Sequence, residues 1–195
     1  AAAIRALSAA MEGSASKNTA AKDARRRRAA DQQQAAADGR AKAIAQSATG
    51  GPMQLHWVSH CLGQVMGEDD ILVNESQIPT PFLGHRKPGT YFGNSPAAGL
   101  GWGTGASLGV KLAARDRRVF AAIGDGAYMF GNPTPAHFVS ANMELPICTL
   151  VINNRMWGAV RKATLGLHPD GAASRLNRSP LTAVEPSPEY HKIVE

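Results

Sequence analysis

Cysteine and aromatic residues are scarce in this sequence of 195 residues, which has two cysteines and only 6% aromatic side chains. Cys61 and Cys148 are too few and too far apart in the sequence for a zinc cluster. A disulfide between them is conceivable, but Cys148 falls in an apolar strand pattern and Cys61 in a helical one. We therefore predict two reduced, buried thiols, which are typical of a cytoplasmic enzyme.

Long apolar runs are also lacking. None reaches the length needed to cross a bilayer, and the chain does not open with the charged and then apolar segments of a signal peptide. We expect no contact with a membrane. The first residue is Ala rather than Met, and residues 191–195 stop within a predicted helix start. The sequence is therefore interpreted as a piece of a longer protein.

The net charge of +6 at pH 7 belongs almost entirely to the first fifty residues. Residues 1–50 hold nine Lys and Arg against four Asp and Glu, whereas residues 51–195 hold twelve against eleven. The second part therefore offers no large cationic face, and we expect no nucleic-acid partner. Residues 1–50 are rich in helix-forming Ala, Gln and Arg but almost lack larger apolar side chains. We interpret them as a solvated linker, largely helical or disordered, despite the run of four arginines at 25–28.

Residues 51–195 alternate between helical periodicity and short apolar runs. A helix is predicted from about Pro52 to Met66, a buried strand over residues 71–73, and a Gly-rich segment that becomes a helix ending before Asp116. A 195-residue chain accommodates one such domain and an appendage. The pattern predicts an α/β fold, a three-layer doubly wound domain with a mainly parallel sheet and helices on both faces.

The most informative stretch runs from Val119 to Val160. An apolar run ends in Gly124-Asp125-Gly126, a helical segment follows, and a second apolar run ends in Asn153-Asn154. This is the pattern of a βαβ unit, in which both strands end at the same edge of the sheet. We therefore expect Asp125 and Asn154 to lie close together. A carboxylate and an amide oxygen among glycines indicate a site for a hard cation that itself holds a phosphate.

Three other patterns suggest different functions, but each lacks a sequence feature that its function requires. His56 and His60 have zinc-binding spacing, but no Glu stands between them as in HExxH. Residues 101–106 fit the GxGxxA fingerprint of nicotinamide dinucleotide sites, and residues 105–109 fit the GxSxG nucleophile elbow. Neither directly follows a buried strand. Dinucleotide binding is retained as the weaker alternative function.

The paired motifs resemble the diphosphate-binding domain of thiamine diphosphate enzymes, within the acetolactate synthase and benzoylformate decarboxylase group. The resemblance rests on the Gly-Asp-Gly of residues 124–126, the 26 residues that separate it from Asn153-Asn154, and the Ala-Ala-Gly-Leu-Gly-Trp-Gly of residues 97–103. It covers roughly residues 50–195. It implies a binding domain over residues 51–195, truncated at its C-terminus, and a linker over residues 1–50.

The resemblance also assigns roles to individual residues. It implies that Mg²⁺ is bound by the side chains of Asp125 and Asn154 and by the carbonyl of Met156. Backbone N–H groups around Gly124, Gly126 and Ala127 are expected to approach the diphosphate. Many relatives carry a serine where Ala127 stands.

Three further cofactor contacts follow from the same resemblance. Gln77 corresponds to a glutamine that contacts the diphosphate, although Ile78 replaces a histidine often found beside it. The carbonyl of Ala98 is expected to accept a hydrogen bond from the 4′-amino group. Leu100 is expected to be the apolar wedge between the two cofactor rings.

The activity implied by the resemblance is cleavage next to the carbonyl of a small 2-oxo acid, as in a lyase or transferase that gives an aldehyde or a carboligation product. The glutamate that activates the cofactor belongs to a separate pyrimidine-binding domain, of the same or another chain, in a homodimer or tetramer. Residues 1–50 do not resemble that domain, and Glu75 is placed at the diphosphate end. We therefore expect no catalytic residue in this chain and no activity from it alone. One alternative is a natural subunit of a split two-subunit decarboxylase.

Overall fold

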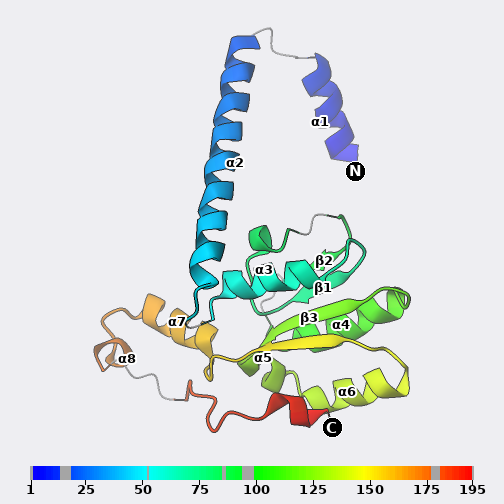
Figure 1. Ribbon diagram of the computed structural model, residues 1–195, viewed down its shortest axis with the longest axis vertical. Helices are drawn as coiled ribbons and strands as arrows, with labels where there is room; N and C mark the ends of the chain where they lie inside the picture. The colour runs from blue at the N-terminus through cyan, green and yellow to red at the C-terminus, as the bar shows by residue number, and fades with distance from the viewer. Residues whose placement is uncertain are drawn as a thin grey trace. The chain divides into compact units, whose positions relative to one another are not determined.

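The computed structural model describes residues 2–13, 19–51, 53–84, 87–93, 99–176 and 181–194. They belong to two compact units, Ala1–Pro52 and Met53–Glu195. The first unit contains α1 (Ala2–Gly13) and α2 (Thr19–Ser47) (Figure 1). Along its whole length α2 buries no side chain, which agrees with the solvated helix expected from its composition.

The second unit is built on a parallel sheet. Its described strands lie in the order β2-β1-β3-β4, and every pairing is parallel. They are β1 (Ile71–Asn74), β2 (Tyr91–Phe92), β3 (Val119–Gly124) and β4 (Cys148–Ile152). All of β1 and nearly all of β3 are buried, because a parallel sheet is covered on both faces and its central strands are continuously apolar.

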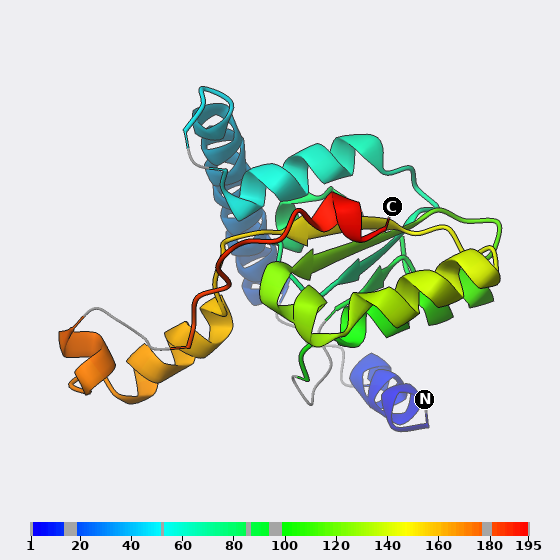
Figure 2. The same ribbon diagram turned by 90° about the horizontal axis from the view of Figure 1, so that it is seen from below.

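Helices cover both faces of this sheet, as Figure 2 shows with α3 on one side and α4 and α6 on the other. Leu62 of α3 packs with Leu72 and Phe120, whereas α4 packs against Ile71 and Val119, whose side chains point to the opposite face. The predicted three-layer α/β architecture is therefore confirmed. The helical elements of this unit are α3 (Leu55–Val65), η1 (Thr80–Phe82), α4 (Trp102–Ala113), α5 (Asp125–Phe130), α6 (Pro133–Asn142), α7 (Gly158–Leu167), α8 (Ala172–Arg175) and η2 (Tyr190–Ile193).

Several local expectations require correction. Cys61 and Cys148 are free thiols, but both are exposed rather than buried. Cys61 lies on the outer side of α3, and Cys148 opens β4, which is an edge strand of the described sheet. The helix expected from Pro52 begins at Leu55, and Pro52 itself lies outside the described residues. The single helical segment expected between β3 and β4 is two helices, since Pro133 starts a new one.

Among the described residues, no helix is both long enough and apolar enough to span a membrane.

An aspartate and an arginine join β1 to β3 at the edge where these strands begin. Asp70, only 6% exposed, accepts hydrogen bonds from the Nε atom of Arg118 at 3.0 Å and from one of its terminal nitrogens at 2.5 Å. The backbone N–H of Gly67 donates to the same carboxylate at 2.7 Å. This bidentate ion pair ties together the starts of the two central strands.

A side-chain contact between Tyr128 and His137 connects α5 to α6. Tyr128 is 2% exposed, and its hydroxyl lies 2.6 Å from the Nε2 atom of His137. Burial lowers the pKa of His137 below its ordinary value. Burial also raises the pKa of Tyr128, helped by neighbouring Tyr190. Because burial disfavours the charged imidazolium, protonation of His137 is less favourable in the folded chain than in the unfolded one.

We predict that the stability of the chain depends on pH through His137. Since the pKa of this residue is lower in the folded chain, the unfolded chain binds more protons near its ordinary pKa of about 6.5, and the free energy of unfolding falls as pH decreases through that value. Above about pH 7.5 this loss in the free energy of unfolding is absent. Urea denaturation across this range should show a shallower pH dependence for His137→Gln, and no change for the exposed control His168→Gln. Equal slopes in the three proteins would contradict the assignment.

Candidate diphosphate and metal site

The carboxyl ends of three neighbouring strands meet at one edge of the sheet. In the register of the sheet, Gly124 at the end of β3 pairs with Ile152 at the end of β4, and Asn74 at the end of β1 pairs with Ala122. The polar residues that follow each strand therefore emerge side by side, as the βαβ pattern predicted. This edge is where ligands bind in open α/β sheets.

A cleft of about 440 Å³ lies at this edge. It is lined by every residue predicted to contact the cofactor or metal except Ala98, which lies outside the described residues. The lining includes Gln77, Leu100, Gly124, Asp125, Gly126, Ala127, Asn154 and Met156, together with Glu75 and Trp157. A larger cavity of about 760 Å³ lies between α6, β4 and η2, and none of the predicted site residues lines it.

Asp125 is the most informative residue of the cleft. It opens α5 directly after β3 and is only 2% exposed. Its Oδ2 atom is buried and has no hydrogen-bond partner among the described residues. A buried carboxylate oxygen without a partner is costly, and coordination of a cation removes that cost. The donor set of carboxylate, amide and carbonyl oxygens suits Mg²⁺. The residues present therefore fit a magnesium ion.

The negative charge of Asp125 also acts on Tyr190 in η2. Burial raises the pKa of the Tyr190 hydroxyl, and the charge of Asp125 raises it further. Tyr190 stands edge-on to Tyr128, with ring centroids 5.7 Å apart. The charge of Asp125 therefore acts on a pair of aromatic residues in contact with each other.

The loop after β4 carries the other two predicted metal ligands. The Oδ1 atom of Asn154 accepts a hydrogen bond from the N–H of Met156 at 3.0 Å, and the carbonyl of Met156 accepts one from the N–H of Gly158 at 2.8 Å. Arg155 between them has a φ of +58°. Each oxygen keeps a second lone pair, so both remain able to coordinate a metal.

A distant segment, residues 182–187, braces this loop. The carbonyl of Thr182 accepts from the N–H of Trp157, and the N–H of Val184 donates to the carbonyl of Arg155, both at 2.8 Å. The side chain of Asn153 donates to the Oγ atom of Ser187 at 2.8 Å. The sequence alone does not indicate this brace, because the region after residue 166 has no periodic apolar pattern.

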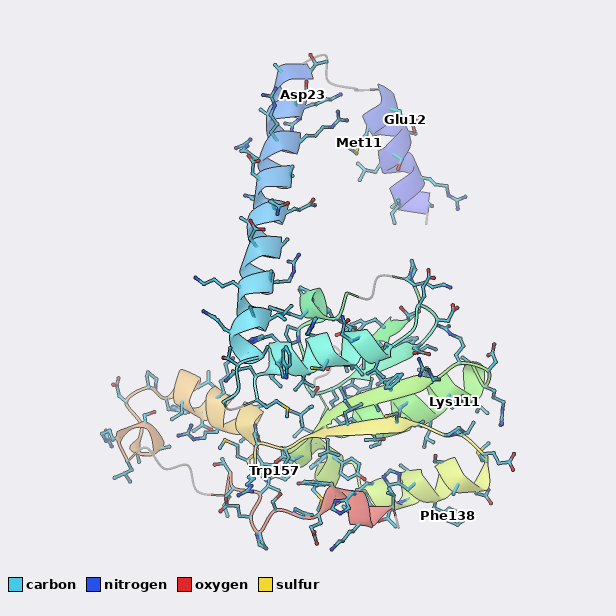
Figure 3. The ribbon with its side chains drawn as sticks, viewed as in Figure 1. Met11, Glu12, Asp23, Lys111, Phe138 and Trp157 are labelled. Carbon is cyan, nitrogen blue, oxygen red and sulfur yellow. The ribbon has the colours of Figure 1, made fainter. Side chains whose placement is uncertain are left out.

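Trp157, which is labelled in Figure 3, packs against Gly126 of the Gly-Asp-Gly turn. A Cβ atom added to Gly126 would lie 2.6 Å from the Cε3 atom of the indole ring. The ring is also edge-on to Phe130, with centroids 6.5 Å apart. Gly126 is therefore required for the close approach of α5 and the loop after β4, and Trp157 both lines the cleft and supports it.

The loop after β1 places Gln77 at the cleft. The buried side chain of Asn74 donates to the carbonyl of Ile78 at 2.9 Å and to the hydroxyl of Tyr91 at 3.1 Å. These bonds close a tight loop in which Gln77 has a φ of +59° and is exposed. Gln77 is thus held at the rim, where a diphosphate contact was predicted.

The serine and the two histidines of the competing motifs have structural contacts in this fold. Ser107 is buried within α4 and donates to the carbonyl of Thr104 at 2.8 Å, so it is not the exposed serine of a nucleophile elbow. His56 lies against Phe82 and His60 against Trp57, with ring centroids 5.2 and 5.6 Å apart. Within the described ranges no cluster of three or more His, Cys, Asp or Glu residues could hold a metal.

The fold and the cleft define an α/β domain that binds a ligand at the carboxyl edge of a parallel sheet. Comparison with known proteins gives the family: residues 76–195 match the model of the thiamine pyrophosphate enzyme, C-terminal TPP binding domain. The chain belongs to this family, as the paired motifs predicted.

Relatives and solved structures agree with this assignment. The chain is 35% identical to benzoylformate decarboxylase of Pseudomonas aeruginosa over 127 residues, covering 63% of this chain and 23% of the relative. It is 26% identical to acetolactate synthase of Mycobacterium avium over 149 residues, covering 74% and 23%. A thiamine diphosphate-dependent 4-hydroxybenzoylformate decarboxylase of Rhodococcus jostii superposes with a TM-score of 0.61 at 26% identity, covering 74% of this chain and 26% of that one. The chain thus spans about a quarter of the length of its relatives.

We predict that the two glycines of the Gly-Asp-Gly turn respond differently to substitution. Gly126→Ala should lower the free energy of unfolding by about 1–3 kcal/mol, because the clash with Trp157 outweighs the helix propensity gained. Gly124→Ala is the control, because a Cβ atom there meets no described atom within 4 Å. Its effect should stay within about 0.5 kcal/mol. Urea denaturation followed by circular dichroism measures both, and equal losses would refute the close packing.

Proposed function

We propose that this chain is the thiamine diphosphate- and magnesium-binding portion of a 2-oxo acid decarboxylase or carboligase of the acetolactate synthase and benzoylformate decarboxylase group. The observation that carries the proposal is the buried, unpartnered Oδ2 atom of Asp125 at the carboxyl edge of the sheet. It stands in a domain whose family binds thiamine pyrophosphate. The names of the relatives support the substrate class.

In this proposal Mg²⁺ is bound by the side chains of Asp125 and Asn154 and by the carbonyl of Met156. Asp125 is the anchor, since it is the only one of the three that is buried. The loop that carries the other two is fixed by residues 182–187. The ion neutralises a diphosphate that would otherwise repel the carboxylate.

The rest of the cleft holds the cofactor. Gly124, Gly126 and Ala127 offer backbone without bulky side chains, and Gln77 stands at the rim for a polar contact with the diphosphate. Leu100 and Ala98 act at the ring end, as wedge and as carbonyl acceptor. Bound thiamine diphosphate supplies the electron sink for cleavage next to a carbonyl. The chain's own residues bind, orient and desolvate it.

Activation and substrate choice are assigned to other residues. A pyrimidine-binding domain, in the same chain or a partner, supplies the activating glutamate across the interface of a homodimer or tetramer. The relatives are about three times as long as this chain, which leaves room for such a domain in each of them. A two-subunit enzyme in which this chain is one natural subunit is the alternative.

A nicotinamide dinucleotide module is less well supported. The GxGxxA glycines do open α4, but the described strand before them is the two-residue β2 rather than a buried strand. Asp125 follows β3 and lines the same cleft as Asn154, instead of standing alone at the end of a strand as a ribose ligand does.

The decisive test is the magnesium dependence of cofactor binding. In isothermal titration calorimetry, the chain should bind thiamine diphosphate with MgCl₂ and lose at least tenfold in affinity with EDTA. Asp125→Ala should cause a similar loss, because the anchoring carboxylate is removed. The exposed Asp116→Ala is the matched control and should bind like wild type. Magnesium-dependent affinity unchanged in Asp125→Ala would remove Asp125 from the site, and binding of NADH in place of thiamine diphosphate would favour the alternative module.

We also predict that the chain alone does not decarboxylate 2-oxo acids. The activating glutamate is assigned to another domain, so pyruvate or benzoylformate with thiamine diphosphate and Mg²⁺ should release carbon dioxide at the rate of the protein-free control. A coupled assay for the aldehyde measures this. Turnover close to that of a full-length relative would contradict the assignment of cofactor activation to another domain.

A further inference from the structure

We propose that Glu75 is a positioning residue: it clamps the segment Gly99–Gly103 to the end of β1 and so sets the place of Leu100 in the cofactor cleft. This inference rests on the proposed function and deepens it. Glu75 is one residue past β1, is half-buried and lines the same cleft as Asp125.

Both oxygens of the Glu75 carboxylate are used in the clamp. The Oε1 atom accepts a hydrogen bond from the N–H of Gly101 at 2.5 Å, and the Oε2 atom accepts one from the N–H of Gly103 at 2.7 Å. These amides are 26 and 28 residues away in sequence. Hydrogen bonds between an ionised carboxylate and backbone N–H groups are shorter and stronger than neutral ones.

The clamp takes the place of a helix cap. The first N–H groups of a helix have no acceptor within the helix, and a Ser, Thr, Asp or Asn at the N-cap usually supplies one. The N-cap of α4 is Gly101, which has no side chain and a φ of +82°. Glu75, which directly follows β1, provides the missing acceptor. Its negative charge is also favourable at the positive end of α4.

Glycines allow the carboxylate of Glu75 to lie this close to the start of α4. A Cβ atom on Gly103 would lie 2.6 Å from the Oε2 atom of Glu75. A Cβ atom on Gly101 would lie 2.5 Å from the Cα atom of Gly131, just after α5. The glycines of this segment, which produce the misleading GxGxxA pattern, therefore serve close contact with Glu75 and with the end of α5.

The hydrogen bond between Glu75 and Gly101 restrains Leu100 through the peptide group that links Leu100 to Gly101. The N–H bound by the Oε1 atom of Glu75 belongs to the peptide that links Leu100 to Gly101, so fixing it restrains the backbone of Leu100. Leu100 is 37% exposed and lines the cleft. An exposed apolar side chain on a restrained backbone is already placed for a ligand.

Glu75 is itself tied to the strand that carries Asp125. The N–H groups of Glu75 and Ser76 both donate to the carbonyl of Ala122 in β3, at 2.8 and 3.0 Å. Ala122 lies three residues before Asp125. Backbone segments and these hydrogen bonds thus join the metal end of the cleft to Leu100 at the ring end. Glu75 sets the spacing between these two ends.

The test separates the two ends with two probes. Thiamine diphosphate uses the whole cleft, whereas inorganic pyrophosphate uses only the diphosphate end. Both are titrated with MgCl₂ into the wild-type chain, Glu75→Gln and Glu75→Ala. We expect Glu75→Ala to bind thiamine diphosphate at least tenfold more weakly and pyrophosphate within twofold of wild type. Glu75→Gln, which keeps the size of the side chain and one acceptor oxygen, should lie between.

Asp70→Asn is the matched control, because Asp70 also fixes an end of β1 but at the opposite edge of the sheet. It should reduce stability and leave both affinities within twofold. Amide hydrogen exchange without ligand provides a second measurement. The N–H groups of Gly101 and Gly103 should exchange at least tenfold faster in Glu75→Ala and at the wild-type rate in Asp70→Asn.

Each contrary outcome has a defined meaning. Equal losses for both probes in Glu75→Ala would show a merely structural role and overturn the inference, as would unchanged affinity for thiamine diphosphate or unchanged exchange at the two glycines. In these cases the proposed function stands if the wild-type chain binds the cofactor with Mg²⁺. A wild-type chain that binds neither probe overturns both proposals.

Discussion

Parallel pairing of β3 with β4 aligns Gly124 with Ile152, and the rest of the site depends on this register. It brings the Gly-Asp-Gly turn and the Asn-Asn loop to one edge of the sheet from opposite ends of a 26-residue connection. A shift of one residue would turn the side chains of β4 to the other face and separate the oxygens. Leu150 and Val151 of β4 pack against buried residues of β3 on opposite faces of the sheet and so fix the register. The core of the domain and the geometry of the cleft therefore have a common origin.

The cleft also shows how a charged site is built within an apolar domain. Asp125 has a buried oxygen without a partner in the described part of the chain, next to the aromatic rings of Tyr128 and Tyr190. Such an arrangement is unfavourable for the protein alone and becomes favourable when a cation is bound. The carboxylate of Glu75, by contrast, has both oxygens occupied by backbone N–H groups. Two acidic residues in one cleft thus have different roles because their hydrogen-bond partners differ.

Much of the fold could be predicted because its signals are local. The apolar runs at residues 71–73, 119–124 and 148–152 are strands, and the helical periodicity after residues 55 and 102 is confirmed. The errors lie where burial depends on neighbours. Cys61 and Cys148 have the sequence context of core residues, but one faces outward from α3 and the other lies on an edge strand. Local pattern does not say which strand has a neighbour on both sides.

The sequence by itself determined the family and the identity of the candidate ligands, because a carboxylate and an amide after two parallel strands meet at one edge in any βαβ unit. Only the tertiary structure decided what supports them. The brace from residues 182–187, the packing of Trp157 on Gly126 and the clamp from Glu75 to Gly101 join residues 25 to 34 positions apart in the sequence. Such contacts leave no periodic signal, because each consists of a few hydrogen bonds or one ring contact between residues whose positions are set by the completed sheet.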